Sequence, residues 1–215
     1  MPVCVLITAE FSPEPALEAM WLGELPTQRR DQLSTKEPRA RHRSLLATRL
    51  LAAALRRAGH PPSLLATLHQ PPRSQPTLAA PLHFSLSHCD GRVVCALSTD
   101  GPVGVDVEAL AGVKAAEFTR YLGAEERAWA GLSARRFLSV WTRKEAVVKA
   151  AGSAGLAAVP TVETAPAGQV ATLAGRTWHT VALPVGRAHL GHLALADHGS
   201  PLRIERVRRA ELEAL

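Results

Sequence analysis

The stretch that most constrains the fold reads Val103-Gly104-Val105-Asp106-Val107-Glu108. Its alternation predicts a β-strand, because successive side chains of a strand point to opposite faces. The valines then fill a buried face, and Asp106 and Glu108 share the other face. Two neighbouring carboxylates repel each other, and a hard cation such as Mg²⁺, which prefers oxygen ligands, relieves that repulsion. The same pair also fits an ordinary half-exposed strand with two solvated acids.

A second motif reads Trp141-Thr142-Arg143-Lys144-Glu145-Ala146-Val147-Val148-Lys149. It lies in a helix predicted from about residue 133 to residue 151. Trp141, Glu145 and Lys149 are spaced i, i+4 and i+8, which places them on one side of that helix. The spacing is also typical of a surface Glu–Lys pair with an anchoring tryptophan. Interpreted as a site, Glu145 completes the cation site, and Lys149 faces a phosphate or a transferring proton.

A third motif reads Phe84-Ser85-Leu86-Ser87-His88, at the end of a predicted strand. Asp90-Gly91 follows and predicts a tight hairpin into a second strand at 92–98. The Ser87 hydroxyl, the His88 imidazole and nearby backbone N–H groups are suited to bind a phosphate. A Ser–His nucleophile pair is disfavoured, because neighbours in a strand point to opposite faces and no G-x-S-x-G elbow is present.

The order of the remaining elements predicts an α+β fold. A strand is expected at 3–8, a helix at 38–57, a proline-rich loop at 70–81, and β-segments at 169–173, 177–183 and 189–196, before a mixed polar tail at 203–215. The turn at 99–104 is the natural boundary. We therefore expect an N-terminal half at 1–101 and a C-terminal half at 102–215.

Basic residues are concentrated in the predicted helix at 38–57. The chain has a formal net charge of +6, and this segment contains six arginines without an acidic residue, namely Arg39, Arg41, Arg43, Arg49, Arg56 and Arg57. Such a face suits a phosphate-bearing or acidic partner, and it predicts salt-sensitive binding. A solvated helix face has the same pattern.

Cysteine usage and hydropathy argue against a disulfide framework, a zinc site and a membrane-spanning protein. The three cysteines (Cys4, Cys89 and Cys95) form no C-x-x-C pair, and the His83, His88 and Cys89 cluster fits no usual metal-ligand spacing. No apolar run approaches the roughly 20 residues needed to span a membrane. The N-terminal residues lack the pattern of a signal peptide, so we expect a cytoplasmic location.

The three motifs, in this order and spacing, resemble the two-domain, Sfp-type 4′-phosphopantetheinyl transferases, which activate fatty-acid, polyketide and nonribosomal-peptide carrier proteins. That family has S-H after a short strand, then G-[VI]-D-[VI]-E, then W-[ST]-x-K-E-[AS]-x-x-K. Arg43-Ser44-Leu45-Leu46 and the stretch from Phe118 to Arg127 are also similar to it. The resemblance covers about residues 26 to 155. It implies two similar α+β halves, related as a pseudo-dimer, with the active site in the cleft between them.

The resemblance also implies an activity and roles for residues. The enzyme would transfer phosphopantetheine from coenzyme A to a carrier-protein serine with Mg²⁺, release 3′,5′-ADP and work as a monomer. Asp106, Glu108 and Glu145 would hold the metal, and Glu145 and Lys149 would act in catalysis. Cofactor contacts would come from Arg43, Ser87, His88, Asp106, Lys144 and Lys149.

One departure from the family pattern precedes the S-H strand. The family has G-[KR]-P where this chain reads Arg73-Ser74-Gln75-Pro76, so Arg73 would supply the missing charge from one place earlier. Two other functions remain open at this point. One is a metal-dependent nuclease or phosphohydrolase. The other is a basic nucleic-acid-binding module, which the 4% aromatic content disfavours, so nucleic acid is not the expected partner.

Overall fold

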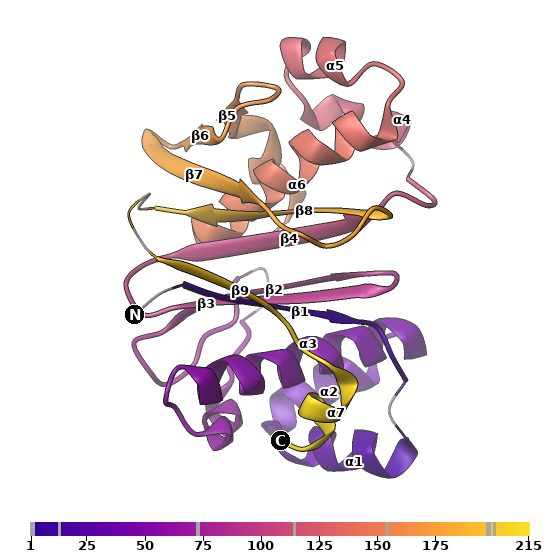
Figure 1. The fold of residues 1–215 in the computed structure, drawn as a ribbon, viewed down its shortest axis with the longest axis vertical. Helices are drawn as coiled ribbons and strands as arrows, with labels where there is room; N and C mark the ends of the chain where they lie inside the picture. Colours follow the sequence, from indigo (N-terminus) through magenta and orange to yellow (C-terminus); the bar gives the residue numbers. More distant parts are fainter. Residues whose placement is uncertain are drawn as a thin grey trace.

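Two β-sheets face each other at the centre of the protein, and helices cover their outer sides (Figure 1). The computed structural model describes residues 3–12, 14–71, 74–113, 115–153, 155–196, 199 and 201–215. Buried residues from both sheets, among them Val5, Val94, Val105 and Leu193, form one apolar cluster between them. The fold is α+β, as the sequence predicts.

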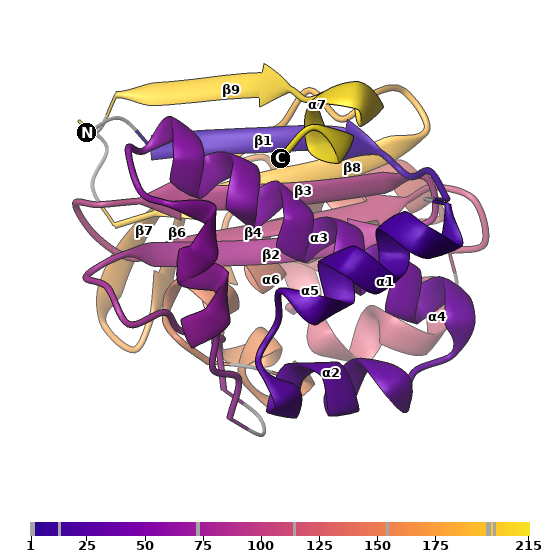
Figure 2. The same ribbon diagram turned by 90° about the horizontal axis from the view of Figure 1, so that it is seen from below.

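The first sheet has four strands in the order β2-β3-β1-β9. They are β1 (Val3–Ala9), β2 (His83–Cys89), β3 (Arg92–Ser98) and β9 (Leu202–Arg206). The hairpin of β2 and β3 turns at Asp90-Gly91, as predicted, and Gly91 has a φ of +79° that favours glycine. Viewed from below, the strands follow one another across the sheet from β9 to β2 (Figure 2).

The second sheet has five strands in the order β4-β8-β7-β6-β5, all paired antiparallel. They are β4 (Val103–Ala109), β5 (Glu163–Thr164), β6 (Val170–Leu173), β7 (Arg176–Ala182) and β8 (His189–Leu195). Strand β4 contains the alternating motif, and Val103, Val105 and Val107 are buried between the sheets. The predicted buried face of this strand is therefore confirmed.

Helix α3 (Pro38–Arg57) covers the first sheet, together with α1 (Pro15–Gly23) and α2 (Thr27–Ser34). It begins where expected, with a proline in its first turn and a Glu37 side chain that accepts a hydrogen bond from Ala40 N. Its leucines, including Leu46 and Leu50, are fully buried against the sheet. Arg49 is buried as well and pairs with Glu24 at 2.6 Å, so this arginine is not available to a partner.

Helix α6 (Ala134–Ala150) covers the second sheet, beside α5 (Ala124–Ala130) and the short α4 (Ala115–Phe118). The Ser133 hydroxyl caps its N-terminus by accepting from Arg136 N at 3.3 Å. Both long helices of the site, α3 and α6, are thus confirmed. No helix in the described parts of the chain is long and apolar enough to cross a membrane.

The C-terminal tail joins the first sheet rather than the second. Strand β9 pairs parallel with β1, with Val5 opposite Ile204, and α7 (Arg209–Glu213) follows it. A boundary at residue 101 had placed this tail in the C-terminal half. The two sheets also differ in strand number, and the similarity of the two halves stays a prediction.

At Gly104, strand β4 lies directly against the backbone of helix α6. A Cβ atom at this position would lie 2.0 Å from Ala146 O and 2.4 Å from Ala150 N, both on the backbone of α6. Backbone atoms cannot rotate away as a side chain can, so only glycine fits while α6 keeps this position.

We therefore predict that Gly104→Ala destabilises the protein by about 3 kcal/mol, because the added methyl group forces α6 away from β4. Urea denaturation of the purified variant measures this change. Gly101→Ala is the matched control, since a Cβ at residue 101 meets nothing within 4 Å. Equal stability of the two variants would contradict the prediction.

Candidate active site

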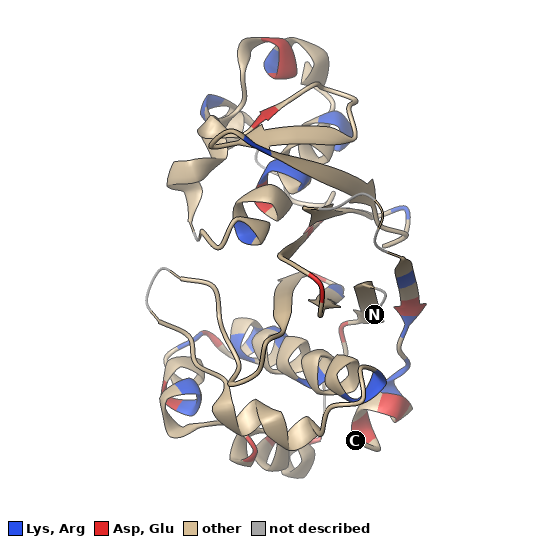
Figure 3. Cartoon of the chain, turned by 90° about the vertical axis from the view of Figure 1, so that its left-hand side faces the viewer, with Lys and Arg blue, Asp and Glu red and all other residues tan. Residues whose placement is uncertain are grey.

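Two neighbouring pockets lie where the two sheets and the helices α3 and α6 come together. One has a volume of about 470 Å³ and the other about 450 Å³, and His88, Glu108 and Trp141 line both. We call the second one the lysine pocket, because Lys36 and Lys149 line it. Basic segments occur on helices above and below this region (Figure 3).

The three predicted metal ligands all line the lysine pocket. Asp106 and Glu108 come from β4, and Glu145 comes from α6. Trp141, Glu145 and Lys149 also share this pocket, so the helical spacing placed them on one side as expected. In the described part of the chain, no three or more His, Cys, Asp or Glu side chains are grouped as metal ligands. The metal set stays a prediction.

Asp106 is a buried carboxylate with two differently occupied oxygens. Its Oδ1 accepts from Lys149 Nζ at 2.7 Å and from Ser87 Oγ at 2.9 Å. Its Oδ2 is buried and has no hydrogen-bond partner among the described residues. A buried carboxylate oxygen without a partner is costly, and a cation bound there would satisfy it.

The ammonium group of Lys149 donates hydrogen bonds to other groups of the protein. Nζ donates to Asp106 Oδ1 at 2.7 Å, to Val105 O at 3.1 Å and to Ser87 Oγ at 3.2 Å. An ammonium has three N–H donors. All three are therefore occupied in this arrangement, and Lys149 brings positive charge to the pocket while it holds β4 and β2.

Burial and neighbouring negative charge raise the pKa of two carboxyls in the pocket. Burial, and then the Asp106 carboxylate, raise the pKa of Glu145 to about 7. The same causes raise the pKa of Glu108 to about 7. In both cases Lys149 partly opposes the rise. Lys149 therefore does not offset the combined effect of burial and the Asp106 charge on these two carboxyls, and a cation bound beside them would lower their pKa values.

His88 lies on the opposite face of β2 from Ser87, as the alternation requires. Its Nε2 is 3.2 Å from Ser44 Oγ on α3. Burial, followed by the charges of Arg43 and Lys149, lowers the pKa of His88 to about 4. The imidazole is therefore neutral at physiological pH, and it binds a phosphate only as a hydrogen-bond donor.

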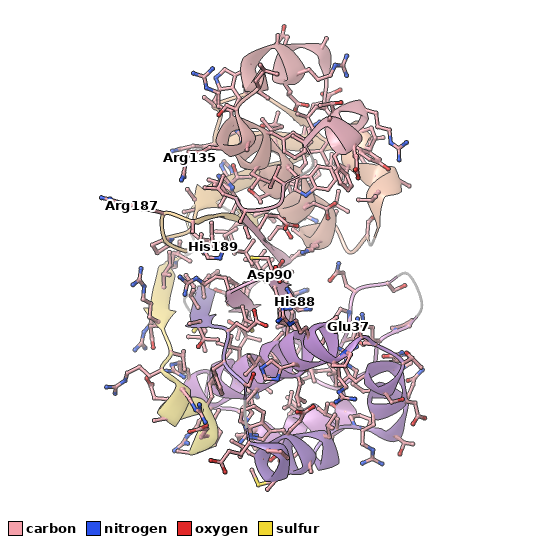
Figure 4. All side chains as sticks on the ribbon, turned by 90° about the vertical axis from the view of Figure 1, so that its right-hand side faces the viewer. Glu37, His88, Asp90, Arg135, Arg187 and His189 are labelled. Carbon is pink, nitrogen blue, oxygen red and sulfur yellow. The ribbon has the colours of Figure 1, made fainter. Side chains whose placement is uncertain are left out.

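Arg43 lines the 470 Å³ pocket and does not line the lysine pocket. Its guanidinium pairs with Asp90, and Nε lies 3.7 Å from Glu10 Oε1. Figure 4 shows Asp90 between His88, on β2 of the first sheet, and His189, on β8 of the second sheet. His189 Nε2 donates to Asp90 O at 2.9 Å, so this turn of the first sheet is linked to β8 of the second sheet.

Lys144 lies apart from the other residues that the sequence predicts to bind the cofactor. It was expected to bind the cofactor, but it is only 1% exposed, lines neither of these pockets and pairs with Glu126 at 2.7 Å. Glu126 is buried too, and the same Oε2 accepts from Gly123 N at 2.6 Å. The pair joins α5 to α6, and the cofactor contact of Lys144 stays a prediction.

The loop at residues 73–76, where the chain departs from the family pattern, is described from Ser74 onward. Arg73 lies outside the described residues, so its predicted contact stays a prediction. Ser74, Gln75 and Pro76 line the lysine pocket, and Gln75 Nε2 donates to Ser153 O at 2.9 Å. Gln75 therefore ties this loop to the end of α6.

Two basic residues of the lysine pocket were missed by sequence reasoning. They are Arg29 on α2 and Lys36 just after it. Burial lowers the pKa of Arg29, and its guanidinium donates to Gln70 Oε1. Lys36 is one of only four lysines in the chain. That scarcity was a usable signal, but no motif surrounds the residue.

The fold and the site define an α+β protein in which a carboxylate cluster and basic side chains line one pocket. A family model described as the 4′-phosphopantetheinyl transferase superfamily matches residues 102–179, which include β4 and α6. The 4′-phosphopantetheinyl transferase gsp of Aneurinibacillus migulanus is 29% identical over 116 residues. That match covers 52% of this chain and 48% of the relative, or about half of each. Both matches are to this one superfamily, and the family model assigns residues 102–179 to it.

The first prediction from the site concerns the buried ion pair. Lys144→Met should destabilise the protein by about 3–5 kcal/mol, because it leaves the Glu126 carboxylate buried without a counter-charge. Urea denaturation measures the loss. Adding Glu126→Gln should recover much of it, since the amide oxygen still accepts from Gly123 N. A stable Lys144→Met protein with weakened coenzyme A binding would restore the original prediction for this lysine.

The second prediction concerns pH. In metal-free buffer with EDTA, the free energy of unfolding should fall as pH rises from about 4.5 to about 7. The unfolded state ionises Glu145 and Glu108 near the lower value, whereas the folded state keeps them protonated up to the higher one. Glu145→Gln should flatten this fall, measured by urea denaturation at several pH values. Glu163→Gln, at an exposed strand position, is the control and should leave the slope unchanged.

Proposed function

We propose that this protein transfers the 4′-phosphopantetheine arm of coenzyme A to a serine of an apo carrier protein of fatty-acid, polyketide or peptide synthesis. One observation supports this proposal most directly: three carboxylates and three basic side chains line the same pocket. They are Asp106, Glu108 and Glu145, and Lys36, Lys149 and Arg29. A diphosphate ester needs cationic groups for its oxygens, and its transfer needs carboxylates that bind a divalent cation. Both kinds of group meet here.

The donor set of this pocket fits Mg²⁺. Asp106 Oδ2 is buried and has no hydrogen-bond partner among the described residues, and burial, followed by the Asp106 charge, raises the pKa values of Glu108 and Glu145. Asp106, Glu108 and Glu145 would hold the ion. When bound, it would polarise the phosphoryl oxygens and neutralise the charge that develops on the 5′-phosphate of the departing 3′,5′-ADP.

In the proposed reaction, the carrier serine Oγ forms a bond to the β-phosphorus of coenzyme A. The bond between that phosphorus and the bridging oxygen breaks, and 3′,5′-ADP leaves with the electron pair. Such transfers depend mainly on positioning and charge stabilisation. We assign Glu145 as the acceptor of the serine proton, because its carboxylate lines the pocket together with Asp106 and Glu108.

The remaining pocket residues position the substrate and stabilise its charge. The Lys149 ammonium offsets negative charge at the phosphates from its place beside Asp106. Lys36 and Arg29 supply further positive charge at the α2 end of the pocket, and neutral His88 offers a hydrogen bond. Because both sheets of one chain contribute to the pocket, we propose that the enzyme works as a monomer. Its location is proposed to be cytoplasmic.

Intact-protein mass spectrometry tests the reaction directly. An apo carrier protein incubated with the enzyme, coenzyme A and Mg²⁺ should gain the mass of one phosphopantetheine, and EDTA should prevent the gain. Asp106→Asn should reduce the rate by at least about a hundredfold, because it weakens the cation site and the ion pair with Lys149. Asp31→Asn, at an exposed position on α2, is the matched control and should keep full activity.

Two results would contradict the proposal. One is the absence of any mass gain across fatty-acid, polyketide and peptide carriers. The other is metal-dependent cleavage of DNA or of a simple phosphodiester without a carrier protein, which would favour the nuclease alternative. Full activity of Asp106→Asn would overturn the assignment of the metal ligands alone.

A further inference from the structure

Strands β2 and β4 are edge strands through which the two sheets meet. Each stands at the end of its own sheet, and in the described part of the chain no backbone ladder joins them. An edge strand has N–H and C=O groups that need partners, and a buried edge without partners is unstable. The hydrogen-bond partners of the β4 backbone groups that face β2 and α6 therefore determine how the two sheets are joined.

Side chains satisfy these backbone groups. Val105 N donates to Ser85 Oγ at 3.1 Å, and Val107 N donates to Ser87 Oγ at 3.2 Å. Val105 O accepts from Lys149 Nζ at 3.1 Å. Two serine hydroxyls and one ammonium thus replace the ladder that a continuous sheet would have at this position.

The two serine bonds define a register between the strands. Each bond joins residues that are 20 apart in the sequence, so β2 and β4 run in the same direction with a constant offset. A slip of two residues would leave one of the two N–H groups without its hydroxyl. Because side chains alternate along a strand, the register also determines which residues of β2 lie beside Asp106.

Ser85 differs from Ser87 in its surroundings. Ser87 lines the lysine pocket and bonds to Asp106, so it belongs to the site. Ser85 is only 1% exposed and lines neither pocket of the site. Its hydroxyl accepts from Val105 N, next to Asp106 in the chain, and through this bond it acts on the position of β4.

We propose that Ser85 is a positioning residue: its hydroxyl holds β4 in register with β2, so that the carboxylates of β4 stay aligned with Ser87 and His88. The kinetic part of this proposal rests on the transferase function proposed above. The structural part does not, because the bond from Val105 N and the position of Asp106 can be measured without turnover.

The decisive variant is Ser85→Ala, which removes the hydroxyl and little else. Hydrogen exchange of the Val105 amide, followed by NMR, should become about tenfold faster, because that N–H loses its acceptor. The dissociation constant for Mn²⁺, measured by electron paramagnetic resonance, should rise. In the transfer assay kcat should fall about tenfold while KM for coenzyme A changes by less than about twofold, as expected for misalignment after binding.

Matched variants separate positioning from general stability. Ser98→Ala removes another buried strand hydroxyl, which accepts from Asp100 N within its own turn, and it should change neither Mn²⁺ affinity nor kcat. Ser85→Thr retains the hydroxyl and should restore slow exchange and kcat together. If Ser85→Ala does not fold, Ser85→Cys takes its place, because a thiol is a much weaker acceptor of similar shape.

Each outcome decides the proposal. Unchanged exchange of the Val105 amide would show that the bond does not hold β4, and would overturn it. Faster exchange with unchanged Mn²⁺ affinity and kcat would make Ser85 a structural residue only, and would overturn it as well. If the unmodified protein transfers nothing to any carrier, the proposed function fails. The exchange and Mn²⁺ measurements then still decide whether Ser85 positions Asp106.

Discussion

Helix α6 lies so close to strand β4 that its backbone occupies the space of a side chain at Gly104. The rest of the site depends on this contact. It brings Lys149 within reach of Val105 O and of Asp106 Oδ1, and Glu145 of the same helix lines one pocket with the carboxylates of β4. A strand and a helix held at this distance keep a charged cluster in place with little freedom to relax, which is the condition for preorganised electrostatics.

The two lysines of the α6 motif show how helix geometry divides charged residues between structure and site. Lys144 and Lys149 are five residues apart, which turns them about 140° from each other around the helix. Lys149 therefore reaches the pocket and Asp106, whereas Lys144 lies on another side and pairs with buried Glu126. The second pair joins α5 to α6, and its lysine adds no positive charge to the pocket.

Local sequence patterns predicted most of the secondary structure near the site. Strict alternation indicated β4, Asp90-Gly91 indicated the hairpin, and a proline followed by leucine spacing indicated α3. These signals arise from neighbours in the chain, so they can be read without tertiary contacts. The pairing of β9 with β1 was not predicted, because residues 202–206 are polar and mixed, and a parallel pairing joins the two ends of the chain.

By itself, the sequence determined which chemical groups are available and which of them share an element. The spacing of Trp141, Glu145 and Lys149 put them on one helix side, and the alternation of Asp106 and Glu108 put them on one strand face. Only the tertiary structure decided that Lys149 rather than Lys144 meets Asp106, that Arg43 lines the neighbouring pocket, and that Arg29 and Lys36 join the site. These outcomes depend on contacts between residues far apart in the chain, which the packing of α6 on β4 and the serine bonds between β2 and β4 establish.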